Sequence, residues 1–154
     1  MTAKIQSIYR YPVKGLSPEK LDRAHLTAGA FFPGDRLFAI ENGPSGFDPA
    51  APVHQPKTKY LMLMRDDRLA TLRTRYEDAT STLSIVHEGR NAVQADIATN
   101  EGRLTVEAFF RRFMPHDLRG PPRCWQRRVA TASRTRAVAL CRSSISRQSP
   151  SSKP

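Results

Sequence analysis

Two short motifs near the start of the chain contain residue types that bind anions. The motif "YPVKG" places Lys14 beside Gly15, and the bare amide of a glycine can approach an anion closely. The motif "GDRLF" places Arg36 directly after Asp35, and a guanidinium fork matches the geometry of a phosphate. Each motif also has a plainer interpretation, because exposed lysines at strand ends and structural Asp-Arg pairs are common. The residues alone leave both interpretations open.

The remaining titratable residues show no pattern of a catalytic or metal site. The four histidines share no metal-ligand spacing, and the adjacent acids lie in turn-like segments, which is more typical of solvated residues than of a general acid-base pair. The chain contains no G-x-S-x-G, no Walker lysine loop and no G-x-G-x-x-G. We therefore predict no catalytic residue and no metal ligand. These histidines and acids are His25, His54, His87, His116, Asp66, Asp67, Glu77 and Asp78.

Strand patterns surround both anion-binding motifs. Residues 4–13 are rich in β-branched and aromatic side chains, and Pro12 ends their ladder. Residues 34–42 carry apolar side chains on both faces, as in a strand buried on both sides. Residues 43–56 are rich in proline and glycine and indicate a loop. Lys14 is therefore expected where one strand ends, and Arg36 where another begins.

The second half of the chain predicts a hairpin and a helix. Leu72, Thr74 and Tyr76 alternate with arginines, and an acidic turn leads to a second alternating segment and a third strand at residues 91–97. Residues 60–64 form an apolar segment, and its periodicity alone does not settle its secondary structure.

The expected helix covers residues 99–114. Leu104, Ala108 and Phe109 share one of its faces, and Pro115 follows its end. Together these elements predict a mainly β (α+β) fold, with a small antiparallel β-barrel-like domain and one or two helices.

Positive charge is concentrated at the C-terminal end. The formal net charge is +11 at pH 7, yet residues 1–120 contain 17 Lys and Arg against 14 Asp and Glu. Residues 121–154 contain 8 Lys and Arg and no acid. Both cysteines, Cys124 and Cys141, and the only tryptophan, Trp125, also lie there. We therefore predict a folded domain over residues 1–120 and a disordered basic tail over residues 121–154.

The composition also indicates the cellular compartment of the protein. Residues 1–120 contain no cysteine, which excludes a disulfide framework or thiolate metal site there and suits a reducing cytosol. The first residues lack the apolar region of a signal peptide, and no apolar run approaches the roughly 20 residues that span a bilayer. We expect a cytoplasmic protein with no membrane partner.

Two longer stretches resemble a known family. Residues 8–43, "IYRYPVKGLSPEKLDRAHLTAGAFFPGDRLFAIENG", and residues 57–80, "KTKYLMLMRDDRLATLRTRYEDAT", resemble the N-terminal β-barrel domain that precedes the MOSC domain in molybdenum-cofactor sulfurase-like proteins and in the mitochondrial amidoxime-reducing component. The resemblance covers residues 4–122. The ordered combination of motifs carries it, because each motif alone is weak.

This resemblance implies a function and a set of binding residues. Members of the resembled family are oxidoreductases or sulfur carriers that use the molybdenum cofactor (molybdopterin). The resemblance also implies pyridoxal phosphate binding at the family level and redox proteins as partners. The lysine of the "YPVK" turn, the residue after it and the arginine of "DR" contact the phosphate, which implies Lys14, Gly15 and Arg36 here. Relatives have serine after the lysine, so Gly15 can offer only its amide. The metal-ligating cysteine belongs to the following MOSC domain, and neither Cys124 nor Cys141 corresponds to it.

The resemblance also suggests an origin for the tail. Read one nucleotide earlier, its codons can encode "SIINLAS", which is typical of the start of a MOSC domain. We therefore interpret residues 121–154 as an out-of-frame translation that begins near Arg123 and truncates the protein, so that the chain alone neither catalyses nor retains the cofactor. A disordered Ser/Arg-rich tail and an RNA-binding arm stay open. The alternative function is accordingly a nucleic-acid-binding protein that acts through the basic tail, which we do not favour.

Overall fold

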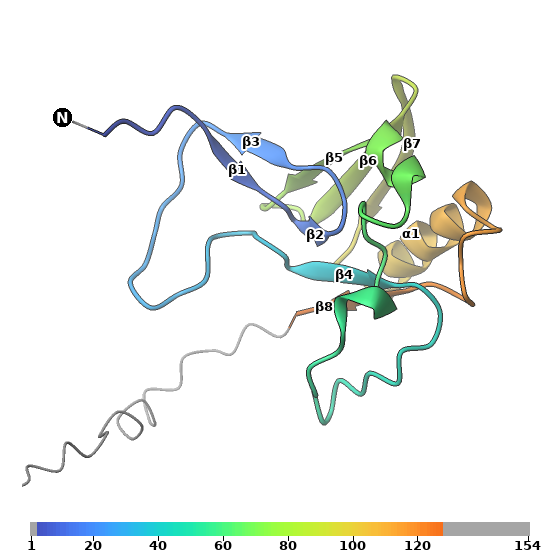
Figure 1. Ribbon diagram of the computed structural model, residues 1–154. Helices are drawn as coiled ribbons and strands as arrows, with labels where there is room; N and C mark the ends of the chain where they lie inside the picture. The colour runs from blue at the N-terminus through green and yellow to red at the C-terminus, as the bar shows by residue number, and fades with distance from the viewer. Residues whose placement is uncertain (1–2, 128–154) are drawn as a thin grey trace, which may run out of the picture.

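The computed structural model describes residues 3–127, so most of the predicted tail, residues 128–154, lies outside the described part. Within that part, Figure 1 shows several short strands and one α-helix, which lies at one side of the molecule. The fold is thus mainly β with one helix, as predicted. The strands are β1 (Ile8–Arg10), β2 (Val13–Lys14), β3 (Glu19–Leu21), β4 (Phe38–Glu41), β5 (Leu72–Glu77), β6 (Thr82–His87), β7 (Arg90–Asp96) and β8 (Arg123–Gln126); the helices are α1 (Asn100–Phe113) and the 3-10 turns η1 (Lys57–Lys59) and η2 (Asp67–Thr71).

The strands form three separate sheets. β1 pairs with β3, β4 lies between β2 and β8, and β6 lies between β5 and β7. All pairings are antiparallel except that of β2 with β4, which is parallel. No closed barrel forms among residues 3–127. The N-terminal strands are too short to continue one ladder around a barrel, since β2 has only two residues.

The predicted hairpin is confirmed. Leu72, Thr74 and Tyr76 on β5 are buried and alternate with exposed Arg73 and Arg75. β6 pairs with β5 along its whole length, and β7 extends the sheet as the predicted third strand. The alternation places one face of this sheet on the core and the other in solvent.

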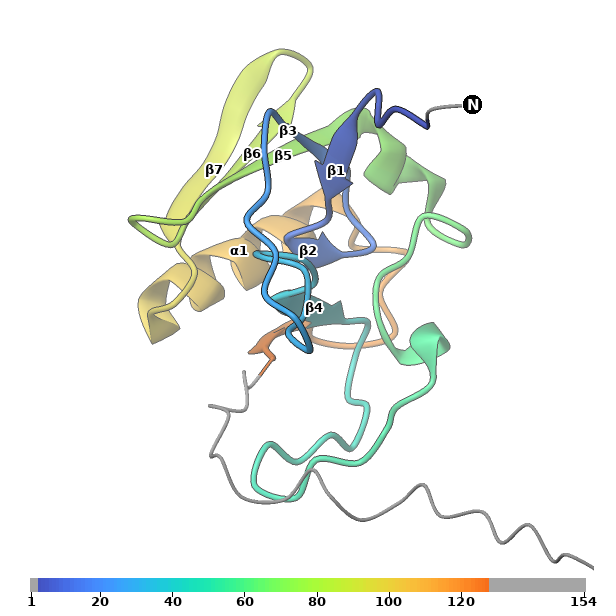
Figure 2. The same cartoon turned by 90° about the vertical axis from the view of Figure 1, so that its left-hand side faces the viewer.

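Helix α1 contacts both β7 and β8, and Figure 2 shows it running below the sheet of β5, β6 and β7. Thr99 caps it, because the Thr99 hydroxyl accepts a hydrogen bond of 3.0 Å from the Gly102 amide. The predicted apolar face is wrong at Leu104, which is 53% exposed. The buried face instead begins at Gly102, where a Cβ atom would lie 1.8 Å from the Asp96 carbonyl oxygen.

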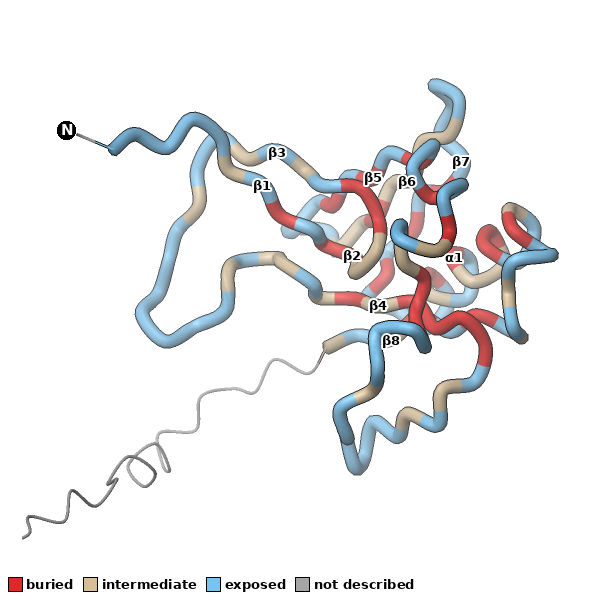
Figure 3. Tube along the Cα trace, viewed as in Figure 1, coloured by how far each residue is buried: buried red, intermediate tan, exposed pale blue. Residues whose placement is uncertain are grey.

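The three sheets and α1 share one hydrophobic core. Figure 3 shows buried residues along β4, and Val106, Phe109 and Phe110 of α1 belong to the same core. The connections at residues 22–37 and 42–56 are long and largely exposed, and the second of them is the predicted proline-rich loop. The largest fully buried side chains are Phe38, Phe110, Leu16, Ile40, Leu61, Leu69, Leu72, Leu83, Ile85, Ile97, Met114 and Val13.

Strand β8 lies beyond the predicted domain boundary at residue 120. It pairs antiparallel with β4, and Cys124 is buried opposite Ile40. The Cys124 amide also donates a 2.8 Å hydrogen bond to the Glu107 carboxylate on α1. Residues 121–127 therefore belong to the folded region and not to a disordered tail, because β8 pairs with an edge of β4 that would otherwise be open.

Candidate functional site

Lys14, Gly15 and Arg36 line the same cavity, which has a volume of about 390 Å³. Lys14 is the last residue of β2, and Arg36 lies two residues before β4 begins. The structure therefore brings together all three residues that the sequence singled out, and their role in binding stays a prediction. The remaining lining residues are Tyr11, Leu16 and Leu63.

Parallel pairing of β2 with β4 positions these residues. Lys14 lies opposite Ala39 in the register. Just before this pairing, the Arg36 amide donates to the Tyr11 carbonyl at 2.6 Å, and the Tyr11 amide donates to Asp35 Oδ1 at 2.8 Å. These two bonds of Tyr11 thus hold the segment that contains Arg36 close to the residues just before β2, the strand that ends at Lys14.

The predicted ion pair between Asp35 and Arg36 is present but loose. Asp35 Oδ2 lies 3.7 Å from Arg36 Nε, and the Arg36 side chain is 67% exposed. Such an exposed pair contributes little stability. The guanidinium of Arg36 thus stays accessible from the cavity.

Lys14 is a partly buried cation with a second cation nearby. Its Nζ lies 4.2 Å from the centre of the Tyr60 ring, a distance typical of a cation–π contact. Burial lowers the pKa of Lys14, and the positive charge of Arg36 lowers it further. The six residues that line the cavity include no carboxylate. This electrostatic environment favours an anion between the two cations.

Gly15 is required by a close approach of two backbone segments. Its φ angle is +84°, in the region that favours glycine, and a Cβ atom would lie 2.2 Å from the Leu61 carbonyl oxygen. Serine at this position could not fit unless Leu61 moved.

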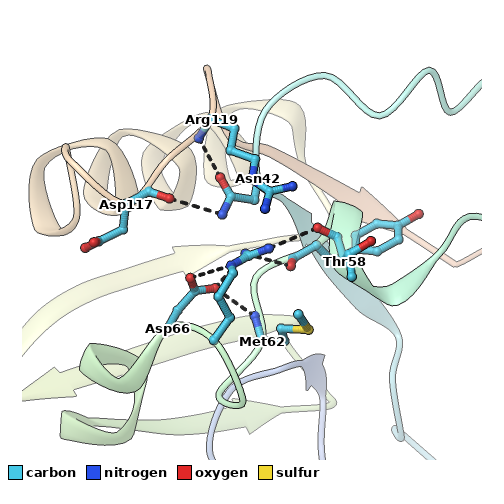
Figure 4. A network of polar contacts seen from close by, with 8 residues as sticks. Asn42, Thr58, Met62, Asp66, Asp117 and Arg119 are labelled. Carbon is cyan, nitrogen blue, oxygen red and sulfur yellow. Dashed lines mark hydrogen bonds and ion pairs between the residues drawn. The ribbon is translucent and has the colours of Figure 1, made fainter.

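Tyr60 contacts Lys14, and the sequence did not reveal this contact. It lies in the apolar segment without periodicity, and the structure shows no strand there, only an isolated bridge between Tyr60 and Glu41. The side chain of Arg65 bonds to the carbonyls of Thr58 and Tyr60, as Figure 4 shows. The only signal in the sequence is the Arg65-Asp66 pair that follows the segment.

Two of the predicted solvated acids are instead partners of arginines. Asp66 is buried beside Arg65, and Asp78 lies 2.6 Å from Nη1 of the buried Arg10. The prediction of a solvated side chain is therefore wrong for Asp66, because a hydrogen-bonded pair with arginine makes burial tolerable. No group of three or more His, Cys, Asp or Glu residues within residues 3–127 could hold a metal ion.

A larger cavity of about 630 Å³ lies between α1 and β8. Cys124 lines it, but burial, reinforced by the charge of Glu107, raises the pKa of this thiol to about 12. A thiol with such a pKa is a poor nucleophile near neutral pH. Cys124 is therefore a core residue.

Residues 2–117 match the family model of the MOSC N-terminal beta barrel domain. No curated protein and no solved structure matches the chain. The matched region contains the cavity, the hairpin and α1, and it ends before β8. No helix in the described part is long and apolar enough to cross a bilayer.

Proposed function

Since this chain belongs to the family of MOSC N-terminal beta barrel domains, we propose that it contributes contacts to the phosphate group of molybdopterin in a protein of the oxidoreductase or sulfur-carrier class. The convergence of Lys14, Gly15 and Arg36 on one cavity supports this proposal most directly. The three residues would hold the phosphate and orient the ligand.

The chemistry of the cavity fits a phosphate. An ammonium, a backbone amide and a guanidinium are the donors that charge-assisted phosphate binding uses. Burial and the nearby charge of Arg36 both lower the pKa of Lys14. An anion bound between the Lys14 and Arg36 side chains would offset both effects. Tyr11 and Leu63 add aromatic and apolar surface beside these donors, against which a flat ligand could pack.

The remainder of the site is proposed to come from a MOSC domain. When bound, the molybdenum cofactor supplies the redox or sulfur-transfer chemistry, whereas this chain's own residues bind and orient it. Tyr11, Leu63 and Met64 expose apolar surface at or next to the cavity. We propose that the MOSC domain covers this surface and thereby excludes water from the phosphate, which strengthens its charge-assisted bonds.

Titration of the full chain with a phosphomonoester tests this function. We expect K14Q and R36Q each to weaken binding about tenfold, because each removes a charged hydrogen-bond donor. K20Q is the matched control, since Lys20 is an exposed residue of β3 that does not line the cavity. Equal affinities of K14Q, R36Q and the wild type, or an equal loss in K20Q, would contradict the proposal.

A further inference from the structure

We propose that Arg65 and Asp66 are positioning residues of the anion site, although neither of them lines the cavity. They act through residues 58–62, the segment that lies against Lys14 and Gly15. This inference rests on the proposed function of the cavity. It adds two residues, outside both anion-binding motifs, on which anion affinity depends.

The guanidinium of Arg65 holds the segment by its carbonyl groups. Nη1 donates to the Thr58 carbonyl at 3.0 Å, and Nη2 donates to the Tyr60 carbonyl at 3.2 Å. Figure 4 shows both bonds reaching the same short segment. The segment is tied to β4 by one isolated bridge only, between Tyr60 and Glu41, so the Arg65 bonds satisfy carbonyls that a longer ladder would otherwise pair.

Asp66 fixes the guanidinium in turn. Its side chain is 3% exposed, and its two oxygens accept bonds of 2.8 Å from Arg65 Nε and Nη2. This two-point geometry restrains both side chains. Asp66 Oδ2 also accepts a 3.1 Å bond from the Met62 amide. The pair therefore binds the segment at three of its residues, Thr58, Tyr60 and Met62.

The segment reaches the anion site through two neighbouring residues. The Tyr60 ring lies 4.2 Å from Lys14 Nζ. The Leu61 carbonyl occupies the space in which a side chain at Gly15 would lie. The Leu61 amide also donates to the Ile40 carbonyl at 2.8 Å, which ties this side of the segment to β4. A shift of the segment would therefore move the ring beside Lys14 and open space beside Gly15.

This role differs from a general contribution to stability. If the segment moves, Lys14 gains water, so its pKa should rise toward the ordinary value because burial is the larger cause of the shift. The anion would then meet a more hydrated and less restrained ammonium. A purely structural pair would change the free energy of unfolding but would leave the pKa of Lys14 and the anion affinity of the folded protein unchanged.

The test compares two identical substitutions in the full chain. R65K keeps the charge, but one ammonium cannot make all four bonds of the guanidinium. R68K is the matched control, because Arg68 pairs with Asp117 across 3.6 Å on the surface and does not line the cavity. Inorganic phosphate is titrated into each variant, and the pKa of Lys14 is followed by NMR of the lysine side chain.

We expect R65K to weaken phosphate binding about tenfold and to raise the pKa of Lys14, while R68K changes neither. Should R65K fail to fold, D66N is judged by the same two measurements, since it keeps the shape of the side chain and weakens its bonds to Arg65. A folded R65K or D66N with wild-type affinity and a wild-type Lys14 pKa would overturn the inference.

Different experimental results would contradict the inference and the proposed function. If the wild type does not bind phosphate, the proposed function is wrong, and the pKa of Lys14 in R65K still decides whether Arg65 positions it. If the wild type binds phosphate and R65K binds it equally well with an unchanged Lys14 pKa, the proposed function stands and the positioning role is wrong.

Discussion

Among single residues, Gly15 shows how a binding motif is constrained by a neighbouring segment. It follows Lys14 directly, so any change in its backbone would redirect the lysine. Its positive φ and its contact with the Leu61 carbonyl are independent reasons for glycine. One is conformational strain and the other is a steric clash, and the two can be separated by mutation.

We predict that G15A destabilises the protein more than G89A. Both glycines have a positive φ, but a Cβ atom at Gly89 has no neighbour within 4 Å, whereas one at Gly15 lies 2.2 Å from a carbonyl oxygen. G89A should cost about 1 kcal/mol of unfolding free energy and G15A about 3 kcal/mol or more. Urea unfolding of both variants measures this difference. Equal losses would show that the Leu61 contact does not constrain Gly15.

Reasoning from residue types identified part of the site. Lys14 and Arg36 were recognisable because their side chains suit an anion, and Gly15 because it follows the lysine. Tyr60 could not be found this way, since an aromatic residue in an apolar segment without periodicity is as consistent with a core position as with a cation–π contact. The burial of Asp66 was missed for a similar reason, because its partner Arg65 is adjacent in sequence and its other bonds are to backbone.

Among the strands and helices, those with regular alternation were predicted best. β5 alternates buried and exposed residues over all six of its positions, and Leu83 and Ile85 of β6 are buried at the same period of two, which leaves only one way to face the core. β8 was missed because its composition matches that of the basic segment after it. Only its pairing with β4 and the burial of Cys124 distinguish it.

The apolar face predicted for α1 differs from its buried face for another reason. Apolar residues occur on more than one side of the helix, and the contact of Gly102 with the Asp96 carbonyl sets its rotation. Leu104 is consequently directed toward the cavity between α1 and β8. The helix is still correctly bounded in sequence, since the structure has it over Asn100–Phe113 with Thr99 as its cap.

This orientation of α1 predicts a large difference between two leucine substitutions. L104A should change the unfolding free energy by less than about 1 kcal/mol, since the side chain is half exposed. L83A, which truncates a fully buried leucine on β6, should cost about 2 to 5 kcal/mol. Chemical denaturation of the two variants tests this. If L104A were as damaging as L83A, the face of α1 described above would be incorrect.

Across the molecule, the proposed anion site depends on segments that are distant in sequence. Lys14 and Arg36 are joined by the pairing of β2 with β4, and residues 58–62 return from a long loop to lie against both β4 and the cavity. The buried Arg10 connects these N-terminal strands to the hairpin, because it bonds to Glu19 on β3 and to the Tyr76 carbonyl on β5. Such an arrangement is tertiary, so no local pattern could have predicted it.

We propose that Lys14 and Arg36 share one bound phosphate, and the pKa of Lys14 with and without saturating inorganic phosphate tests this most directly. Without phosphate, burial and Arg36 hold this pKa below its ordinary value. A bound anion favours the charged ammonium, so by linkage phosphate should raise the pKa of Lys14. We predict this rise in the wild type and a smaller one in R36Q. An unchanged Lys14 pKa at saturating phosphate would contradict the assignment of the cavity as the phosphate site.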